Sequence, residues 1–179
     1  MQYHFYRMHD GGLLDAINEV LVAGVRVAEG RAAEPTAGII DNQSVKTTEA
    51  GGPRDYDAGK KNKGRKRHIA TDTASNLLDT LVHSADIQDR DGAPALIERS
   101  RDAYPSLVRF FADGGYAGQK LEAAIAHLDP LAIEIIKRSD AHRFVILPHR
   151  WVIRRTIAWL NRCRRLAKDW EASIASSEA

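Results

Sequence analysis

The sequence predicts a mixed α/β domain with an N-terminal helical arm. Apolar runs of strand length alternate with segments whose apolar residues recur at helical spacing, which is typical of α/β folds. Hydrophobic residues make up 44% of the 179 residues, and a chain of this length can bury roughly two-thirds of its unfolded surface. A core can therefore form without covalent cross-links. The single cysteine, Cys163, excludes an internal disulfide and a zinc site built from several thiolates.

The first third of the chain is expected to contain a helix, a strand and a loop. Apolar residues at helical spacing predict an amphipathic helix over residues 12–29. A connector at residues 34–36 separates this helix from an apolar strand over residues 37–41. Residues 50–64 contain four glycines, a proline and few apolar groups, which predicts a mobile loop.

The rest of the chain is expected to alternate strands and helices. In chain order we expect strands over residues 67–72 and 77–83 joined by a hairpin turn at 73–76, a helix over 89–103, a strand over 107–113, a helix over 119–127, a strand over 131–137 and a short apolar stretch at 144–147. A long final helix should run from Trp151 to about residue 171, because its apolar residues fall on one stripe. We expect Trp159, Cys163 and Trp170 on that stripe to lie in the core.

The net charge of +2 hides two basic segments. Six of the eight residues at 60–67 are cationic, namely Lys60, Lys61, Lys63, Arg65, Lys66 and Arg67. Residues 143–168 contain eight more cations and no Asp or Glu. Because local potential rather than total charge attracts a polyanion, these segments predict a phosphate-backbone partner. The alternative is that both are merely solvated faces.

Two apolar strands end on aspartate, the first at Asp41 and the second at Asp113. Ligands collect at strand ends in α/β sheets, so the two carboxylates could converge there. Such a pair favours a hard divalent cation, Mg²⁺ or Mn²⁺ rather than zinc. Beside basic segments, a metal site of this kind suits phosphodiester chemistry. The alternative is that Asp41 and Asp113 only cap a turn and a loop.

Several long motifs, in order, resemble one known family. The motifs are residues 39–53 (IIDNQSVKTTEAGGP), 64–68 (GRKRH), 85–92 (ADIQDRDG), 112–118 (ADGGYAG) and 159–168 (WLNRCRRLAK). They resemble bacterial insertion-sequence transposases of the DDE class, and the resemblance spans roughly residues 38–171.

The resemblance implies an RNase H-like fold, a mixed sheet flanked by helices. It also implies an enzyme that cleaves DNA at the element's ends and transfers the strand to target DNA, using three acids that bind two magnesium ions. Asp41 matches the first acid, which bridges the metals, and Asp113 matches the second. Arg150 matches an arginine attributed to DNA-backbone contact, and we also expect Arg155 to bind DNA. The implied partners are double-stranded DNA and a second copy of the chain.

The sequence departs from the family pattern at the third acid, where it has Arg154. A guanidinium cannot ligate a cation and would repel one. Glu171 and Asp169 are poor substitutes, because Glu171 lies about five helical turns, roughly 25 Å, further along the axis. We therefore expect strand transfer to be absent or impaired.

The resemblance also predicts how the chain is divided. We expect residues 1–36 to be a remnant of an N-terminal helical region with its connector, residues 37–171 the catalytic domain, and residues 172–179 a truncated tail. No apolar stretch is long enough for a bilayer and no signal peptide is apparent, which predicts a cytoplasmic protein without membrane or small-molecule partners. Two alternatives stay open: a non-catalytic DNA-binding remnant that competes or co-assembles with intact transposase, and a general magnesium nuclease of the same fold.

Overall fold

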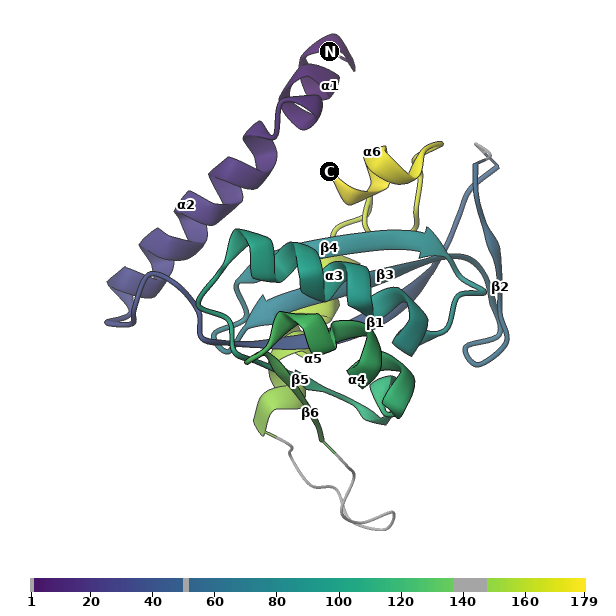
Figure 1. Ribbon diagram of the computed structural model, residues 1–179. Helices are drawn as coiled ribbons and strands as arrows, with labels where there is room; N and C mark the ends of the chain where they lie inside the picture. The colour runs from purple at the N-terminus through teal and green to yellow at the C-terminus, as the bar shows by residue number, and fades with distance from the viewer. Residues whose placement is uncertain (1, 50–51, 137–147) are drawn as a thin grey trace.

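The computed structural model describes residues 2–49, 52–136 and 148–179; the side chains of Gln2 and of residues 148–150 lie outside that description. Its centre is a mixed sheet (Figure 1). The strands are β1 (Ala37–Lys46), β2 (Asp55–Asp57), β3 (Asn62–Asp72), β4 (Leu77–Ser84), β5 (Arg109–Ala112) and β6 (Ala132–Ile135). Around them lie α1 (Gln2–Asp10), α2 (Leu13–Ala28), α3 (Asp89–Ala103), the short turn η1 (Gly114–Tyr116), α4 (Gln119–Ile125), η2 (Ala126–Leu128), α5 (Pro148–Arg162) and α6 (Ile174–Glu178).

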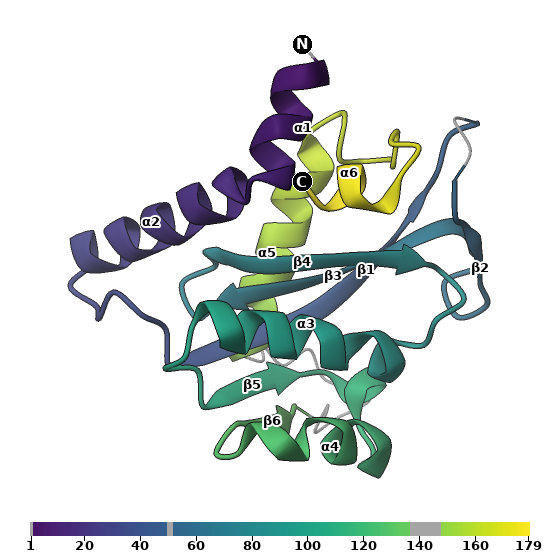
Figure 2. The same ribbon diagram turned by 45° about the horizontal axis from the view of Figure 1, so that its top comes forward.

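The strand order confirms the predicted fold class. The core of the sheet runs β4–β3–β1–β5–β6, and β2 adds to the start of β3. β3 is antiparallel to both β1 and β4, whereas β5 and β6 are parallel to β1. Three antiparallel strands followed by two parallel ones, with helices on both faces, are the arrangement of the RNase H-like fold. Figure 2 shows α3 and α4 on one face and α5 on the other.

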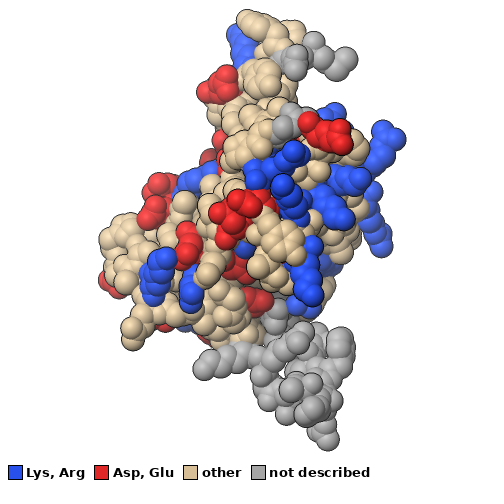
Figure 3. Space-filling model, turned by 90° about the vertical axis from the view of Figure 1, so that its right-hand side faces the viewer, with Lys and Arg blue, Asp and Glu red and all other residues tan. Residues whose placement is uncertain are grey.

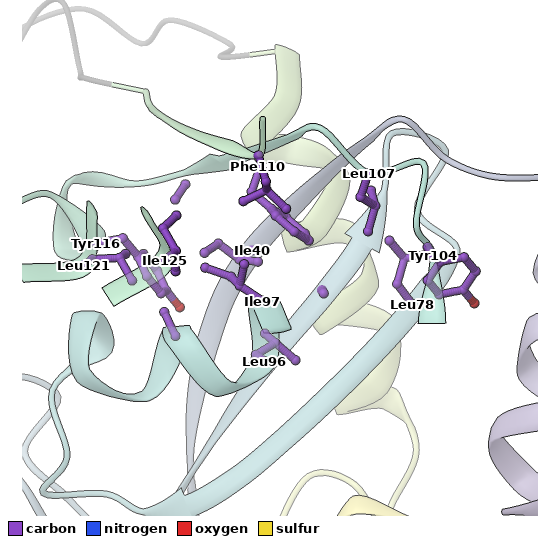
Figure 4. Close-up of a cluster of buried hydrophobic side chains, with 14 of the residues drawn as sticks. Ile40, Leu78, Leu96, Ile97, Tyr104, Leu107, Phe110, Tyr116, Leu121 and Ile125 are labelled. Atoms are coloured by element: carbon purple, nitrogen blue, oxygen red, sulfur yellow. The ribbon is translucent and has the colours of Figure 1, made fainter. Parts of the chain in front are cut away.

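The two faces of the sheet carry separate cores because successive strand residues point to opposite sides. Ile40 and Phe110 belong to the cluster beneath α3 and α4, which Figure 4 shows together with Leu96 and Ile97 of α3. Ile39 belongs to the other cluster, which joins the sheet to α5; its buried members are Ile39, Ile69, Phe111, Val152 and Ile153. By the same alternation Asp41, which follows Ile40, faces α5.

The N-terminal arm is attached to this body along one line of α2. Val22 is buried in the α3-side core, and the Asn18 amide donates a hydrogen bond to the Leu77 carbonyl (2.9 Å). The buried Arg26 guanidinium pairs with Asp72 at 2.6 Å. The rest of the helix extends away from the sheet (Figure 1). Its exposed large apolar side chains are Leu13, Ile17, Val20, Leu21, Val25 and Val27.

Most predicted elements are present, and two predictions are wrong. The helix at 89–103 and the turn at 73–76 are found as expected, and the other elements differ at their ends. Residues 55–57 and 62–64, predicted to be loop, pair as β2 and the start of β3. The final helix ends at Arg162 rather than near residue 171. The apolar stretch predicted at 144–147 lies outside the described residues.

The early end of α5 also changes the environment of the residues predicted to be its core. Cys163 is exposed, and Trp159 and Trp170 have exposed fractions of 52% and 46%. The chain turns after α5 because Asp169 hydrogen-bonds to the end of β1 and pairs with a buried arginine. These tertiary contacts override the helical periodicity of the segment. Within the described ranges, none of the helices has the length and apolar character needed to cross a membrane.

Candidate active site

The parallel pairing of β1 and β5 brings the two predicted acids to one level of the sheet. Ile39 is paired with Phe111, and Asp41 and Asp113 each follow two residues later. Both aspartates line a small hollow whose walls include Ile153 of α5. The convergence predicted from the two strand ends is therefore found on the α5 face.

The carboxylate of Asp41 is in an environment that disfavours its charge. Burial raises the pKa of Asp41 above its usual value, and the neighbouring Asp113 raises it further. The Asn42 backbone N–H, which donates to Asp41 at 2.8 Å, and the cations Lys60 and Arg154 act in the opposite direction on this pKa. Positive charge beside Asp41 thus stabilises its ionised form.

Asp113 also has a local structural role. Its side chain accepts a hydrogen bond from the Gly115 backbone N–H at 2.9 Å and so caps the short turn η1. The capping that sequence reasoning gave as an alternative is present in the structure together with the approach to Asp41. One carboxylate can serve both purposes because it has two oxygens with several acceptor positions.

α5 places Arg154 at this site and turns its apolar neighbours inward. Val152, Ile153 and Thr156 are buried against the sheet, whereas Arg154 is exposed. Arg154 nevertheless lies close enough to lower the pKa of Asp41. The site therefore combines two carboxylates and one guanidinium on the same face of the sheet.

Neither acid of the C-terminal segment substitutes for a third carboxylate. Asp169 is buried, pairs with Arg65 at 3.2 Å and accepts a hydrogen bond from Ser177 at 2.6 Å. Glu171 pairs with Arg165 at 2.9 Å. The reason predicted for excluding these acids, a position far along one continuous helix, is wrong because α5 ends at Arg162. They are excluded instead by the partners that hold them.

Sequence reasoning missed the polar groups behind the acid pair on the α3 face. Asn42 donates to the buried Tyr116 hydroxyl at 3.0 Å, and Lys60 donates to the Asn42 carbonyl at 3.1 Å. Tyr116 also lies 3.2 Å from Nδ1 of the buried His68. Strand alternation was the available signal, because Asn42 must face away from Asp41. These contacts fix the backbone that carries Asp41.

The cations of residues 60–67 divide into exposed and buried sets. Lys60, Lys61 and Lys63 are exposed on the β2–β3 hairpin. Lys66 is buried and donates to Asp89 at 2.8 Å, and Arg67 is buried and donates to the Leu166 carbonyl at 2.6 Å. The prediction that Lys66 and Arg67 contact DNA is therefore corrected, because their charges are already paired or hydrogen-bonded inside the protein.

The prediction that Arg65 contacts DNA is corrected in the same way, because its side chain is engaged inside the protein. Its side chain is fully buried. The guanidinium donates to Asp169 and to the carbonyls of Pro53, Glu171, Ala172 and Ser173, at 2.9–3.2 Å. A guanidinium has five N–H donors, and here they hold the C-terminal segment against β3. Arg65 is unavailable to a phosphate.

The two arginines predicted on the final helix have different outcomes. Arg150 lies in α5, but its side chain is outside the described part of the chain. Arg155 is half-buried and donates to the Ser75 hydroxyl at 2.6 Å and to the Ala74 carbonyl at 3.2 Å. Its guanidinium holds the β3–β4 turn and is not freely available to DNA.

The exposed cations of the two basic segments lie on neighbouring parts of the fold. Asp169 exchanges backbone hydrogen bonds with Lys46 and Thr48 at the end of β1 (2.9 and 3.1 Å), and the Gln43 amide hydrogen-bonds to Asn161 of α5. Figure 3 shows Lys and Arg side chains gathered on the face that carries the β2–β3 hairpin. The exposed cations of these segments are Lys60, Lys61, Lys63, Arg154, Arg162, Arg164, Arg165 and Lys168.

Comparison with known proteins identifies the family. The sequence profile described as "Transposase DDE domain" matches residues 32–179, which is most of the chain. The chain belongs to this transposase family. It is 31% identical over 118 residues to a putative transposase for insertion sequence element IS402 of Burkholderia cepacia, a match that covers 60% of this chain and 54% of that protein. The chain thus spans about half the length of this relative.

Two solved structures resemble this member of the DDE family more distantly. The catalytic core domain of BIV integrase has 11% sequence identity and a TM-score of 0.44, with 71% of this chain and 67% of the other covered. A chain of the Mos1 strand transfer complex has 11% identity and a TM-score of 0.38, with 92% and 60% covered.

The donor set of this transposase-family chain does not fit a pair of divalent cations. Among the described residues there is no group of three His, Cys, Asp or Glu side chains that could hold a metal ion. Asp41 and Asp113 supply two carboxylates, and the third position is Arg154, which cannot coordinate a cation and adds positive charge. The residues present fit a pair of acids with a cation near Asp41, not a two-metal centre.

Proposed function

We propose that the chain is the catalytic core of an insertion-sequence transposase whose DNA surface is intact and whose strand-cleavage centre is impaired. The observation that carries this proposal is that Arg154 lies close enough to Asp41 to lower its pKa, while Asp41 and Asp113 line one hollow. Strand cleavage by the family depends on a third acid at that position, and a guanidinium there opposes the Mg²⁺ or Mn²⁺ that we propose as the ancestral cofactor. In this proposal residues 1–36 are a helical arm with its connector, 37–171 the catalytic domain and 172–179 a C-terminal segment.

Cleavage assays on the unmodified chain and an Arg154→Glu variant test the impaired centre. The substrate is a duplex carrying the ends of the surrounding insertion sequence, incubated with Mg²⁺ or Mn²⁺. We expect only background nicking by the unmodified chain. Arg154→Glu should nick at a rate at least about 100-fold above that background, the factor that one transition-state-stabilising group typically contributes. Adding Asp41→Ala to the Arg154→Glu chain should remove the gain.

The outcomes separate the alternatives. Robust metal-dependent nicking of element ends by the unmodified chain would show that Arg154 does not impair the centre. Cutting of any duplex regardless of sequence, abolished by Asp41→Ala alone, would indicate a general nuclease. A chain that binds duplex strongly at low salt but cleaves nothing, even with Arg154→Glu, would indicate a non-catalytic DNA-binding protein.

The non-catalytic alternative is favoured by one observation. Lys61 and Lys63 of the β2–β3 hairpin and the exposed cations of residues 162–168 do not line the hollow of the acid pair, so DNA binding through them does not depend on a working centre. Such a chain could compete for element ends or co-assemble with an intact transposase. A homo-oligomer and binding of target DNA stay predictions of the same kind.

A further inference from the structure

α5 carries two exposed tryptophans that belong neither to a buried core nor to the acid pair, with a half-buried arginine between them. Trp151 and Trp159 have exposed fractions of 46% and 52%. Their spacing of eight residues, with Arg155 midway, places all three on one side of the helix. The Arg155 guanidinium carbon lies 4.5 Å from the centre of the Trp151 ring and 5.0 Å from that of Trp159. We call Trp151, Arg155 and Trp159 the tryptophan ladder.

Hydrogen bonds to the β3–β4 turn hold the ladder in place. Arg155 donates hydrogen bonds to Ser75 and Ala74 of the β3–β4 turn, and Thr156 donates to the Ser75 carbonyl at 3.3 Å. Stacking on a fixed guanidinium limits the motion of both indoles. Aromatic rings of this size normally lie buried in a core. Two exposed rings held in a fixed geometry are a preformed contact surface.

The charge around the ladder determines which partner it fits. From Pro148 to Lys168 the chain contains no Asp or Glu. Among the exposed cations there are Arg154, one turn from Trp151, and Arg162, one turn beyond Trp159. In a symmetric pair of identical chains the same patch would face itself, and these cations would repel. A polyanion with flat rings has the opposite charge and the matching stacking surface.

We propose that the tryptophan ladder binds unpaired nucleotides of DNA, whose bases stack on the indoles while α5 cations contact the phosphates. Every base has a flat face, so an indole can stack on any sequence. Paired bases within a duplex are stacked on one another, so an unpaired tail is the form of DNA that the ladder fits. This inference rests on the proposed function in one respect, the DNA partner.

The test compares three DNAs with the full chain by fluorescence anisotropy. The DNAs are a blunt duplex, the same duplex with a short unpaired thymidine tail, and the duplex with an abasic tail that keeps the phosphates. We expect the thymidine tail to tighten binding by roughly 5- to 150-fold per stacked base. The abasic tail should give little of this gain.

Variants assign the gain to the ladder. Trp151→Ala and Trp159→Ala should each reduce the gain from the thymidine tail, with binding to the blunt duplex nearly unchanged. Trp159→Phe should keep most of it, and Trp159→Leu should lose it, because only an aromatic ring can stack. Trp170→Ala is the matched control: Trp170 is as exposed as Trp151 and lies beside Lys168, but is outside the ladder. Thermal melting checks that each variant is folded.

Distinct outcomes overturn the inference and the proposed function. If the blunt duplex is bound but the thymidine and abasic tails give equal gains, or if Trp159→Leu behaves like Trp159→Phe, the ladder does not stack bases. If the Trp variants change the mass of the chain in sedimentation and keep the gain from the thymidine tail, the ladder contacts another protein, a second copy of the chain. If no DNA is bound at low salt, the DNA partner itself is wrong.

Discussion

At the scale of single residues, the burial of Arg65 is the largest difference between the sequence prediction and the structure. The side chain is fully buried and its donors are shared among Asp169 and four backbone carbonyls. Ionised groups are rarely buried unless they are paired and hydrogen-bonded. The pair with Asp169 therefore contributes to attaching the C-terminal segment to β3.

Removing the acid should destabilise the fold strongly. Asp169→Ala leaves the Arg65 charge buried without its counter-ion, and breaking a buried pair in this way costs about 3–5 kcal/mol. Glu171→Ala, which removes the exposed partner of Arg165, should cost less than about 1 kcal/mol. Urea unfolding followed by circular dichroism measures both free energies of unfolding. Equal, small effects would mean that water reaches Arg65 when Asp169 is absent.

The residues of the acid site were more predictable than the buried cations. Asp41 and Asp113 each follow an apolar run, and that pattern was sufficient to predict their convergence, although β1 does not end at Asp41 as predicted but continues to Lys46. Arg65 lies among the cations of residues 60–67, and the sequence pattern does not distinguish the buried cations from the exposed ones. Its burial depends on acceptors near residue 170, more than 100 positions away. No local pattern can supply such a distant partner.

At the scale of elements, β3 is a polar strand in an interior position. It lies between β1 and β4, and residues 64–72 are all buried. Its polar side chains are accommodated by partners on both faces: Asp89 for Lys66 on the α3 side, and Leu166 for Arg67 on the α5 side. Hydrophobic patterning could not predict the start of this strand. α3 was predicted with its observed bounds, whereas the apolar stripe of the last segment wrongly extended the final helix beyond Arg162.

The same strand should make the protein sensitive to acid. Burial lowers the pKa of His68 to about 3, and the neighbouring His83 and Lys66 also lower it, while Asp89 acts in the opposite direction. Because the folded pKa lies below the unfolded value of about 6.5, the unfolded chain binds more protons as pH falls. Stability is therefore complete above about pH 6.5 and declines below it. His68 alone should lower the free energy of unfolding by about 2 kcal/mol between pH 7 and pH 5.

Denaturant unfolding at several pH values measures this effect. His68→Gln should reduce the loss between pH 7 and pH 5, whatever its cost at neutral pH. His127→Gln is the control, because His127 is exposed and pairs with Glu98 on the surface; its loss of stability between pH 7 and pH 5 is compared with that of His68→Gln. An identical acid loss in the His68→Gln chain would assign the sensitivity to other groups.

At the scale of the whole molecule, the net charge of +2 is not informative, because the fold sorts the charges. Arg65, Lys66 and Arg67 are directed inward, whereas Lys61 and Lys63 stay exposed. The backbone hydrogen bonds between Asp169 and the end of β1 bring the second basic segment alongside. The sequence showed that the two segments exist. Their proximity follows from the turn after α5, which the predicted continuous helix did not contain.

This arrangement predicts which cations set the salt dependence of DNA binding. Each phosphate contact that is lost reduces the slope of log K against log salt by about 0.9. The double variant Lys61→Gln/Lys63→Gln should therefore lower the slope for duplex DNA by about 1.8 and weaken binding equally across sequences. The matched control neutralises two exposed cations near the α3–α4 face, Arg90→Gln/Lys120→Gln, and should change the slope little. A larger change of slope in the control than in the Lys61/Lys63 variant would indicate that the DNA binds on the α3–α4 side. The acid pair lies on the α5 face, so DNA bound on the α3–α4 side could not reach it, and binding there would be unrelated to cleavage.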